Sequence, residues 1–142
     1  MSTDILCNLG AGAVSFGMSR SEVRRVLGEP TKEFVRSRYS PCVEWDYQTL
    51  GMNVIFDRLG ACAGVMLTPS SEPRLEGIAL LDTGAAAAWG AIRRLDPGAR
   101  VEDGSLTSTR LGVSIYAPDV KEEPTEPASS VLVFRPDYFE LS

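Results

Sequence analysis

The strongest constraint on the fold is an alternation of apolar and polar residues that begins at residue 43. It runs over residues 43–48 and again over 52–57, on either side of a Leu50-Gly51 turn. A repeat of two residues places successive side chains on opposite faces of an extended strand. These segments predict two adjacent antiparallel strands with one buried face each, and the apolar run at 62–67 predicts a third.

A short helix is predicted ahead of these strands. Ser19 and Glu22 have the spacing of a capping box, in which each side chain bonds the backbone amide of the other residue. Gly28 is expected to end the helix in a left-handed conformation, and Pro30 prevents its continuation. A second helix is predicted from residue 82 or 83 to residue 95, where an Asp-Pro-Gly stop follows.

The second half of the chain repeats the order of the first. Residues 49–55 have a counterpart in 110–116, and residues 64–69 have one in 131–136. One copy alone could not bury its sheet face, so a duplication that closes a single core is expected.

The predicted architecture is therefore one α+β domain, 1–142, with internal repeats at about 14–73 and 74–136. Each repeat contributes a helix and antiparallel strands, and the strands form one curved sheet with both helices packed on one side. The predicted core contains nine apolar side chains: Val23, Leu27, Trp45, Val54, Phe56, Trp89, Ile92, Val113 and Ile115. Tyr47 lies in the same buried phase of the alternation. Between the last two strands, residues 119–130 contain the acidic, proline-bearing stretch KEEPTEP, which predicts a solvated mobile loop.

Composition excludes several classes of function. The 142 residues contain no histidine, which rules out Ser-His-Asp triads, Cys-His pairs and histidine-containing zinc sites. The net charge of −5 argues against a nucleic-acid partner, and no stretch is long and apolar enough to cross a bilayer. Cys7, Cys42 and Cys62 are an odd, ungrouped set that is expected to stay reduced. We expect a cytoplasmic protein with no cofactor, no membrane partner and no nucleic-acid partner.

The remaining motifs do not indicate catalysis. Gly10 and Gly12 are separated from the first helix by residues 13–16, whereas a phosphate cradle needs its glycines directly at a helix start. Glu44 and Asp46 lie roughly 7 Å apart along one strand, a pattern typical of a solvated face. Neither a calcium loop nor a cluster of thiols is present, so no metal site is predicted, and we expect a protein that is not an enzyme.

The segment around the first helix resembles a known group of small repeat proteins. The resemblance is carried by Phe16-Gly17-Met18, Glu22-Val23 and Leu27-Gly28-Glu29-Pro30, and the two-repeat layout extends it to most of the chain. It is similar to the tandem helix-plus-sheet repeats of the beta-lactamase inhibitor protein and of the outer-membrane assembly lipoprotein BamE (the SmpA/OmlA family). It also looks like small uncharacterised or immunity-type bacterial proteins with an FGM-x-x-x-EV-x-x-x-LG-x-P signature. The resemblance implies a non-catalytic protein that binds other proteins, in the inhibitor's case through the concave face of a sheet. The inhibitor's paired cysteines and the lipoprotein's lipidated segment are absent here, so extracellular inhibition and membrane anchoring are not implied.

A candidate binding site follows from the polar phase of the strands. Ile55 and Tyr116 hold equivalent repeat positions on the face that alternation makes polar, so they are predicted to form an interface centre. The residues predicted around them are polar or acidic and would favour a basic partner: Asn53, Ser114, Glu44, Asp46, Gln48 and Asp57. Equally open is that the KEEPTEP loop or the C-terminal tail covers this face.

The leading expectation is a protein-binding module, in its narrower form an immunity-type inhibitor that occludes a basic bacterial toxin. One alternative is a small-ligand carrier or minor enzyme with a pocket between the sheet and the second helix, where Ala85 to Ala88 would leave room. The other is a structural subunit of a larger assembly. The oligomeric state does not follow from the sequence.

Overall fold

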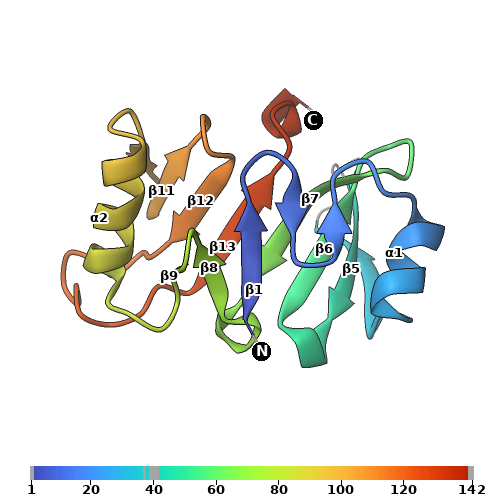
Figure 1. Cartoon of the computed structure of the whole chain (residues 1–142), viewed down its shortest axis with the longest axis horizontal. Coiled ribbons are helices and arrows are strands. Elements are labelled where there is room, and N and C mark those ends of the chain that lie inside the picture. Colours follow the sequence, from blue (N-terminus) through green and yellow to red (C-terminus); the bar gives the residue numbers. More distant parts are fainter. Residues whose placement is uncertain (1, 37, 39–41, 141–142) are drawn as a thin grey trace.

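The computed structural model describes residues 2–36, 38 and 42–140. Its largest element is an eight-stranded sheet in which every neighbouring pair is antiparallel (Figure 1). In spatial order its strands are β10 Arg100–Glu102, β11 Ser105–Ser108, β12 Val113–Tyr116, β13 Ser130–Phe134, β7 Cys62–Leu67, β6 Met52–Phe56, β5 Val43–Tyr47 and β4 Lys32–Val35. The chain is thus α+β, as predicted.

The two strands predicted from alternation and the third predicted from an apolar run are confirmed. β5, β6 and β7 cover the three predicted segments, with the short helix η1 (Gln48–Leu50) in the first turn. Trp45, Tyr47 and Phe56 are buried, as the apolar phase of the alternation required. Gly51 follows η1 in the left-handed region at φ 65°, a conformation that glycine adopts without steric cost.

A second, five-stranded sheet corrects the prediction of a single sheet. In spatial order its strands are β3 Val14–Ser15, β2 Gly10–Ala11, β1 Thr3–Leu6, β8 Pro73–Leu75 and β9 Ile78–Ala79. Its central pair, β1 and β8, is parallel and joins segments about 70 residues apart. Strands of two to four residues are too short for an alternation to show, and a parallel pair leaves no hairpin signal. Gly10 and Gly12 belong to the β2–β3 hairpin of this sheet.

The first helix begins where the sequence predicted. In α1 (Arg20–Leu27), Glu22 N donates to Ser19 Oγ at 3.2 Å, and Ser19 N donates to Glu22 Oε1 at 3.1 Å. Gly28 has a positive φ of 84° but a ψ of −164°, so it ends the helix outside the left-handed helical region that was expected. The second helix, α2 (Ala85–Leu95), starts two to three residues later than predicted.

The late start of α2 reflects an unusual cap. Gly84 stands at the N-cap and has no side chain to offer, so the first amides of the helix bond the KEEPTEP segment instead. Ala85 N donates to the carbonyl of Glu126 at 2.8 Å, and Ala86 N donates to that of Pro124 at 3.1 Å. The segment that was expected to be a free mobile loop therefore closes over the N-terminus of α2, although its side chains remain exposed. The first four backbone amides of an α-helix have no acceptor within the helix, and these carbonyls supply two of the missing acceptors in α2.

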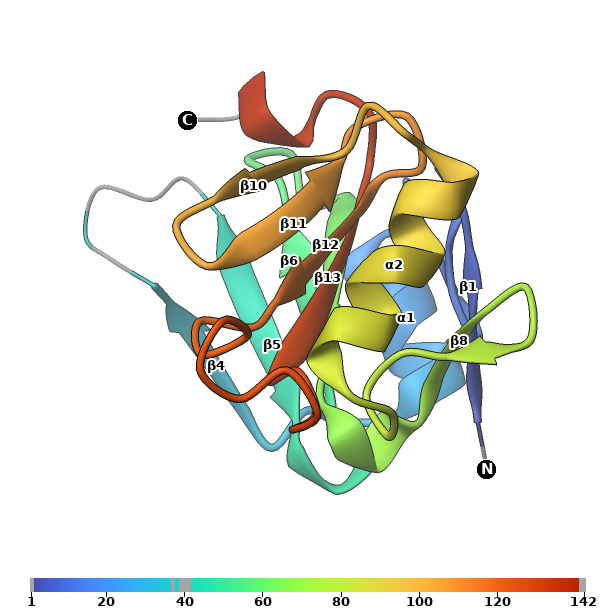
Figure 2. The ribbon, with the colours of Figure 1, turned by 90° about the vertical axis from the view of Figure 1, so that its left-hand side faces the viewer.

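The two helices and the smaller sheet form one layer over the larger sheet. Figures 1 and 2 show α1, α2 and the β1–β8 pair on the same side of the eight-stranded sheet. Side chains from all four parts, including Val23, Trp89, Ile5 and Val54, form one buried cluster between the layers. Eight of the nine predicted core residues are buried, and Leu27 is partly buried against the cluster.

Each helix is followed by four consecutive strands of the large sheet, and the last strands of the two sets, β7 and β13, pair at its centre. The tandem-repeat interpretation remains a prediction, and its register needs a correction. Met52 and Val113 are equivalent positions of the two repeats. Met52 lies opposite Leu67 and Val113 lies opposite Val133, so the repeat partner of Leu67 is Val133. The sequence alignment of the repeats had paired Leu67 with Phe134. A shift of one residue exchanges the two faces of a strand.

The capping box allows a test of the local structure. Ser19→Ala removes the oxygen that accepts from Glu22 N, so the free energy of unfolding should fall by about 1 kcal/mol. Ser21→Ala changes an exposed serine two positions further on and serves as the control, with an expected change below about 0.5 kcal/mol. Urea unfolding followed by circular dichroism measures both. Equal losses in the two variants would contradict a capping role for Ser19.

Candidate functional site

The face of the eight-stranded sheet that points away from both helices is the candidate site, here called the open face. Cross-strand partners in a sheet point to the same side, so the strand register defines rows of side chains on this face. One row crosses all eight strands, over roughly 34 Å at the usual strand spacing. In spatial order this central row contains Lys32, Asp46, Asn53, Met66, Leu132, Ser114, Thr107 and Arg100.

The central row is accessible along its whole length. Its six inner residues are half-buried, and Lys32 and Arg100 at its two ends are exposed. Met66 and Leu132 form an apolar centre where β7 meets β13, and polar side chains flank it on both sides. Two of these, Thr107 and Ser114, share a hydrogen bond of 2.8 Å between their hydroxyl oxygens. The row therefore offers apolar contact at its middle and hydrogen-bonding groups around it.

A groove occupies the C-terminal half of this face. Its volume is about 680 Å³. The lining residues are Gly98, Arg100, Glu102, Asp103, Ser105, Thr107, Thr109, Ser114, Leu132 and Phe139. Phe139, in the short helix η3 (Tyr138–Glu140), forms one wall with 58% of its surface exposed. Figure 2 shows η3 at one end of this face, beside β10 and β11.

Ile55 does not lie on an exposed surface, which corrects its predicted place at an interface centre. It is 2% exposed. It belongs to a second row of the open face, which continues from Ile55 on β6 to Gly64 on β7 and Phe134 on β13. Tyr138 fills the space above Gly64, because a Cβ at that glycine would come within 3.0 Å of the tyrosine ring. The C-terminal tail thus covers this row, which is one of the two alternatives that the sequence left open.

Aromatic contacts hold the tail in place. Phe134 is 1% exposed, and its ring centroid lies 5.9 Å from that of Tyr138 and 4.9 Å from that of Phe139. The rings of Tyr138 and Phe139 are themselves 5.3 Å apart. Such pairs stabilise beyond the burial of their area. Burial also raises the pKa of Tyr138 to about 12, so this phenol stays neutral at physiological pH.

The acidic rim that was predicted around the site is largely neutralised. Glu44 is 4% exposed and accepts two hydrogen bonds from Arg36, at 2.9 Å from Nε and 2.8 Å from Nη2. Asp57 is paired with Arg135, whose Nη2 lies 3.0 Å from its Oδ2. The sequence pattern did not indicate either ion pair, and Arg135 lies 78 positions away from Asp57. Glu44 and Asp57 therefore stabilise the fold and are not free to attract a basic partner.

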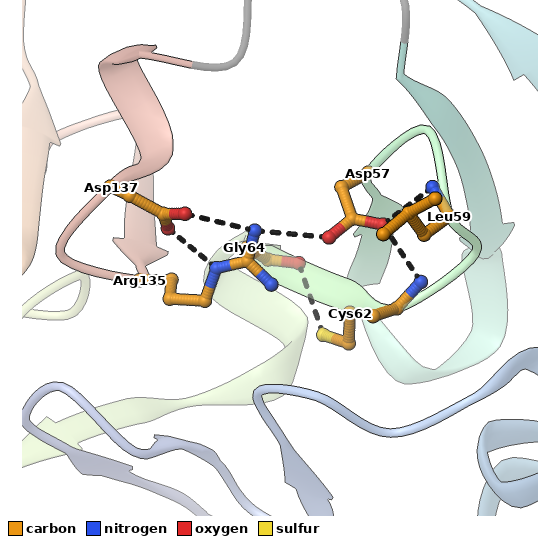
Figure 3. A network of polar contacts seen from close by, with 7 residues as sticks. Asp57, Leu59, Cys62, Gly64, Arg135 and Asp137 are labelled. Carbon is orange, nitrogen blue, oxygen red and sulfur yellow. Dashed lines mark hydrogen bonds and ion pairs between the residues drawn. The ribbon is translucent and has the colours of Figure 1, made fainter.

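Asp57 also organises the hairpin between β6 and β7 (Figure 3). Its Oδ1 accepts from Leu59 N at 2.9 Å and from Ala61 N at 3.0 Å. Burial alone would raise the pKa of this carboxyl, but the backbone amides and the Arg135 guanidinium outweigh burial and lower it below its ordinary value of 3.8. Asp137 holds the other side of the guanidinium, at 2.6 Å from Arg135 Nε.

The structure brings three of the eight predicted site residues into the central row. These are Asn53, Ser114 and Asp46, and the Asn53 amide, oriented with its nitrogen toward Asp46, donates to Asp46 Oδ1 at 2.9 Å. Tyr116 lies on the next row, opposite Ser105 on β11, with 42% of its surface exposed. Gln48 lies outside the sheet in η1.

Several residues of the site were missed in the sequence. Leu132 was not assigned because its strand is apolar in both phases, and Thr107 and Arg100 lie on strands that were not predicted. Phe139 lies in the C-terminal tail, which the sequence indicated only as a segment that could cover this face. The alternation in β12 was the one signal that pointed to this half of the face.

The described residues contain no group of three or more Asp, Glu, Cys or His side chains placed to hold a metal ion. Cys7, Cys42 and Cys62 are not joined by disulfides, and Cys62 is the buried one among them. Burial raises the pKa of Cys62 to about 12, so it remains a protonated, unreactive thiol. Among the described helices none is long and apolar enough to cross a membrane.

The region of the alternative pocket near α2 is occupied by packed side chains. Ala85 and Ala88 are 2% and 1% exposed and join the core cluster with Trp89 and Ile92. One polar atom there is unusual, because the buried indole Nε1 of Trp89 has no hydrogen-bond partner among the described groups. The small-ligand alternative, which the sequence based on the room left by Ala85 to Ala88, remains a prediction.

The fold and the site together define an α+β protein with an accessible antiparallel sheet face and a groove at one end. Comparison of the chain with protein-family models, curated proteins and solved structures gives no match. The likeness to the repeat proteins named above therefore rests on the sequence signature alone.

Proposed function

We propose that this chain is a non-catalytic, cytoplasmic module that binds a protein partner through the groove on its open face. The observation that carries the proposal is the accessible part of the central row, where Leu132, Ser114 and Thr107 line a groove with Phe139 as its wall. Interfaces commonly combine an apolar centre with a polar, hydrogen-bonding surround. Tyr116 is kept as an anchor of the site and Phe139 takes the place of Ile55, because both aromatic side chains are exposed.

A basic partner is favoured by the residues at the edge of the groove. Glu102 and Asp103 are exposed there. The neighbouring Gly104 packs closely on Pro118, since a Cβ added at this glycine would lie 3.1 Å from Pro118 Cα. The acidic segment that begins at residue 119 therefore adjoins this edge of the groove. Residues 119–126 contain four carboxylates and one lysine, a net charge of −3. Complementary charge accelerates encounter and selects partners. An immunity-type inhibitor that occludes a basic toxin is the narrower form of the proposal.

The test is a variant that fills the groove. Ser114→Arg places a long side chain at the centre of the groove, and Ala87→Arg places the same side chain on the exposed side of α2 as the control. Proteins captured from the native lysate by the wild type are identified, expressed and purified, and their dissociation constants are measured with all three chains. We expect Ser114→Arg to weaken binding by at least a hundredfold and Ala87→Arg to change it by less than twofold.

Thermal unfolding of both variants is measured as the control that they fold. Equal affinity of Ser114→Arg and wild type would place the binding site elsewhere. Capture of no protein by the wild type would contradict the proposal and favour the small-ligand alternative. If a partner is found, its own activity is assayed with and without this chain, since an inhibitor must abolish it.

A further inference from the structure

The tip of the β6–β7 hairpin carries the most exposed large apolar side chain among the described residues. Leu59 is 94% exposed, whereas the next most exposed of that group, Leu9, reaches 65%. The tip lies at the end of the molecule that carries α1 (Figure 1), away from the groove. It is therefore a surface that the proposed function does not use.

The tip is held rigidly. Besides the two amide bonds to Asp57 Oδ1, Gly60 N donates to Asp57 O at 3.0 Å, and Asp57 N donates to Ala61 O at 2.8 Å. Arg135 at the end of β13 braces Asp57 from the other half of the chain (Figure 3). A preorganised loop loses little conformational entropy on binding, so its contacts convert more fully into affinity.

The turn itself does not require a leucine. Asp at the first position and Gly at the fourth are favoured in a type I turn, which accounts for Asp57 and Gly60. Leu59 at the third position contributes neither a turn bond from its side chain nor burial in the core. Single exposed apolar side chains are common on protein surfaces, so Leu59 indicates a contact surface only in combination with the bracing of its turn and the charges around it.

The surroundings of Leu59 are basic. Gly17 N donates to Cys62 O and Cys62 N donates to Met18 O, both at 2.8 Å, so the base of the hairpin is tied to the segment that begins α1. This brings Arg20 beside Arg58, and together with Ser19, Ser21, Leu59 and Gly60 they line a shallow depression of about 370 Å³. Residues 19–30 and 58–60 contain four arginines and two glutamates, a net charge of +2. Since the net charge of the whole chain is −5, all the other residues together carry −7.

We propose that this hairpin tip is a second contact surface, which inserts Leu59 into an apolar pocket of a protein partner whose rim carries carboxylates. The arginines at positions 20 and 58 would face that rim, and their charge would be complementary to it. A protein fits better than an anionic bilayer, because a single leucine anchors weakly and the chain as a whole is negative. A protein also fits better than a nucleic acid, because the tip offers no aromatic side chain on which a base could stack.

The test begins with a photoreactive phenylalanine analogue at position 59 and, as the control, at position 9, where the other exposed leucine lies. Irradiation in cells should yield one discrete adduct from position 59 and none of the same mass from position 9. The cross-linked protein is then purified and titrated with Leu59→Ser, Arg58→Glu and Leu9→Ser variants. We expect Leu59→Ser and Arg58→Glu each to weaken binding by tenfold or more, Leu9→Ser to have no effect, and the cross-linked peptide to lie in an apolar pocket bordered by Asp or Glu.

Each other result overturns the proposal. No adduct, an adduct to a second copy of this chain, or unchanged affinity of Leu59→Ser removes the proposed contact. Binding of the wild type to phosphatidylserine vesicles or to duplex DNA, lost in Arg58→Glu, would assign the surface to a different class of partner. Ser114→Arg is titrated in the same series, so the failure of the groove and the failure of the hairpin give different patterns.

Discussion

Replacing Phe134 by alanine is expected to lower the free energy of unfolding by about 3–5 kcal/mol, the usual range for a large aromatic side chain removed from a packed interior. Phe134 is 1% exposed, and its ring contacts both Tyr138 and Phe139. The variant therefore leaves a cavity and also removes the ring on which the C-terminal tail packs. Urea unfolding followed by tryptophan fluorescence measures the loss.

Phe139→Ala is the matched control within the same cluster of rings. Phe139 is 58% exposed, so its removal creates no closed cavity and should cost no more than about 1 kcal/mol. Similar losses in the two variants would contradict the view that the tail is anchored at Phe134. The comparison also bears on function, because Phe139 forms a wall of the groove while Phe134 only supports it. Phe139→Ala should thus weaken partner binding more than it weakens the fold.

The tail explains why the candidate site was only partly predictable from the sequence. Alternation assigned the strands β5 and β6 and the buried face of each, because one side of these strands packs on the helices. The apolar run of β7 predicted a strand but not which of its faces is buried. The same alternation made Ile55 a surface residue, since it contains no information on what lies over the second face. That face is closed at Ile55 because Gly64 leaves room for Tyr138, a contact between residues more than 70 positions apart.

Charge was mispredicted for the same reason. Glu44 and Asp57 are acidic residues on a polar strand phase, and the sequence indicated a solvated acidic rim. Their arginine partners lie on other elements, so the ion pairs of both carboxylates form only in the tertiary structure. Local features fared better: the capping box of α1 lies within four residues and formed as predicted. The cap of α2 did not, because its acceptors lie about 40 residues away, at Pro124 and Glu126.

The second large effect is expected from Arg135, which joins the end of β13 to the hairpin of β6 and β7. Arg135→Ala should lower the free energy of unfolding at pH 7 by about 2–3 kcal/mol, less than the roughly 3–5 kcal/mol that breaking a fully buried pair costs. The loss arises because the carboxylate of Asp57, whose side chain is 11% exposed, would keep its two amide donors but lose its counter-charge. Asp137→Ala removes the half-exposed partner of the same guanidinium and should cost less than about 1 kcal/mol.

The pH dependence of this pair separates its charge from its packing. The folded-state pKa of Asp57 lies below 3.8, so the carboxylate contributes its full stabilisation above that value and loses it as pH falls through the lower, folded-state pKa. In Arg135→Ala the folded-state pKa of Asp57 moves back up, because the guanidinium no longer favours the charged form. The difference in unfolding free energy between wild type and Arg135→Ala should therefore be constant from pH 7 to about 5 and shrink below about pH 4. A difference that stays the same down to pH 2.5 would mean that Arg135 acts through the packing of its side chain, and the hairpin tip would then owe its rigidity to the Asp57 backbone bonds alone.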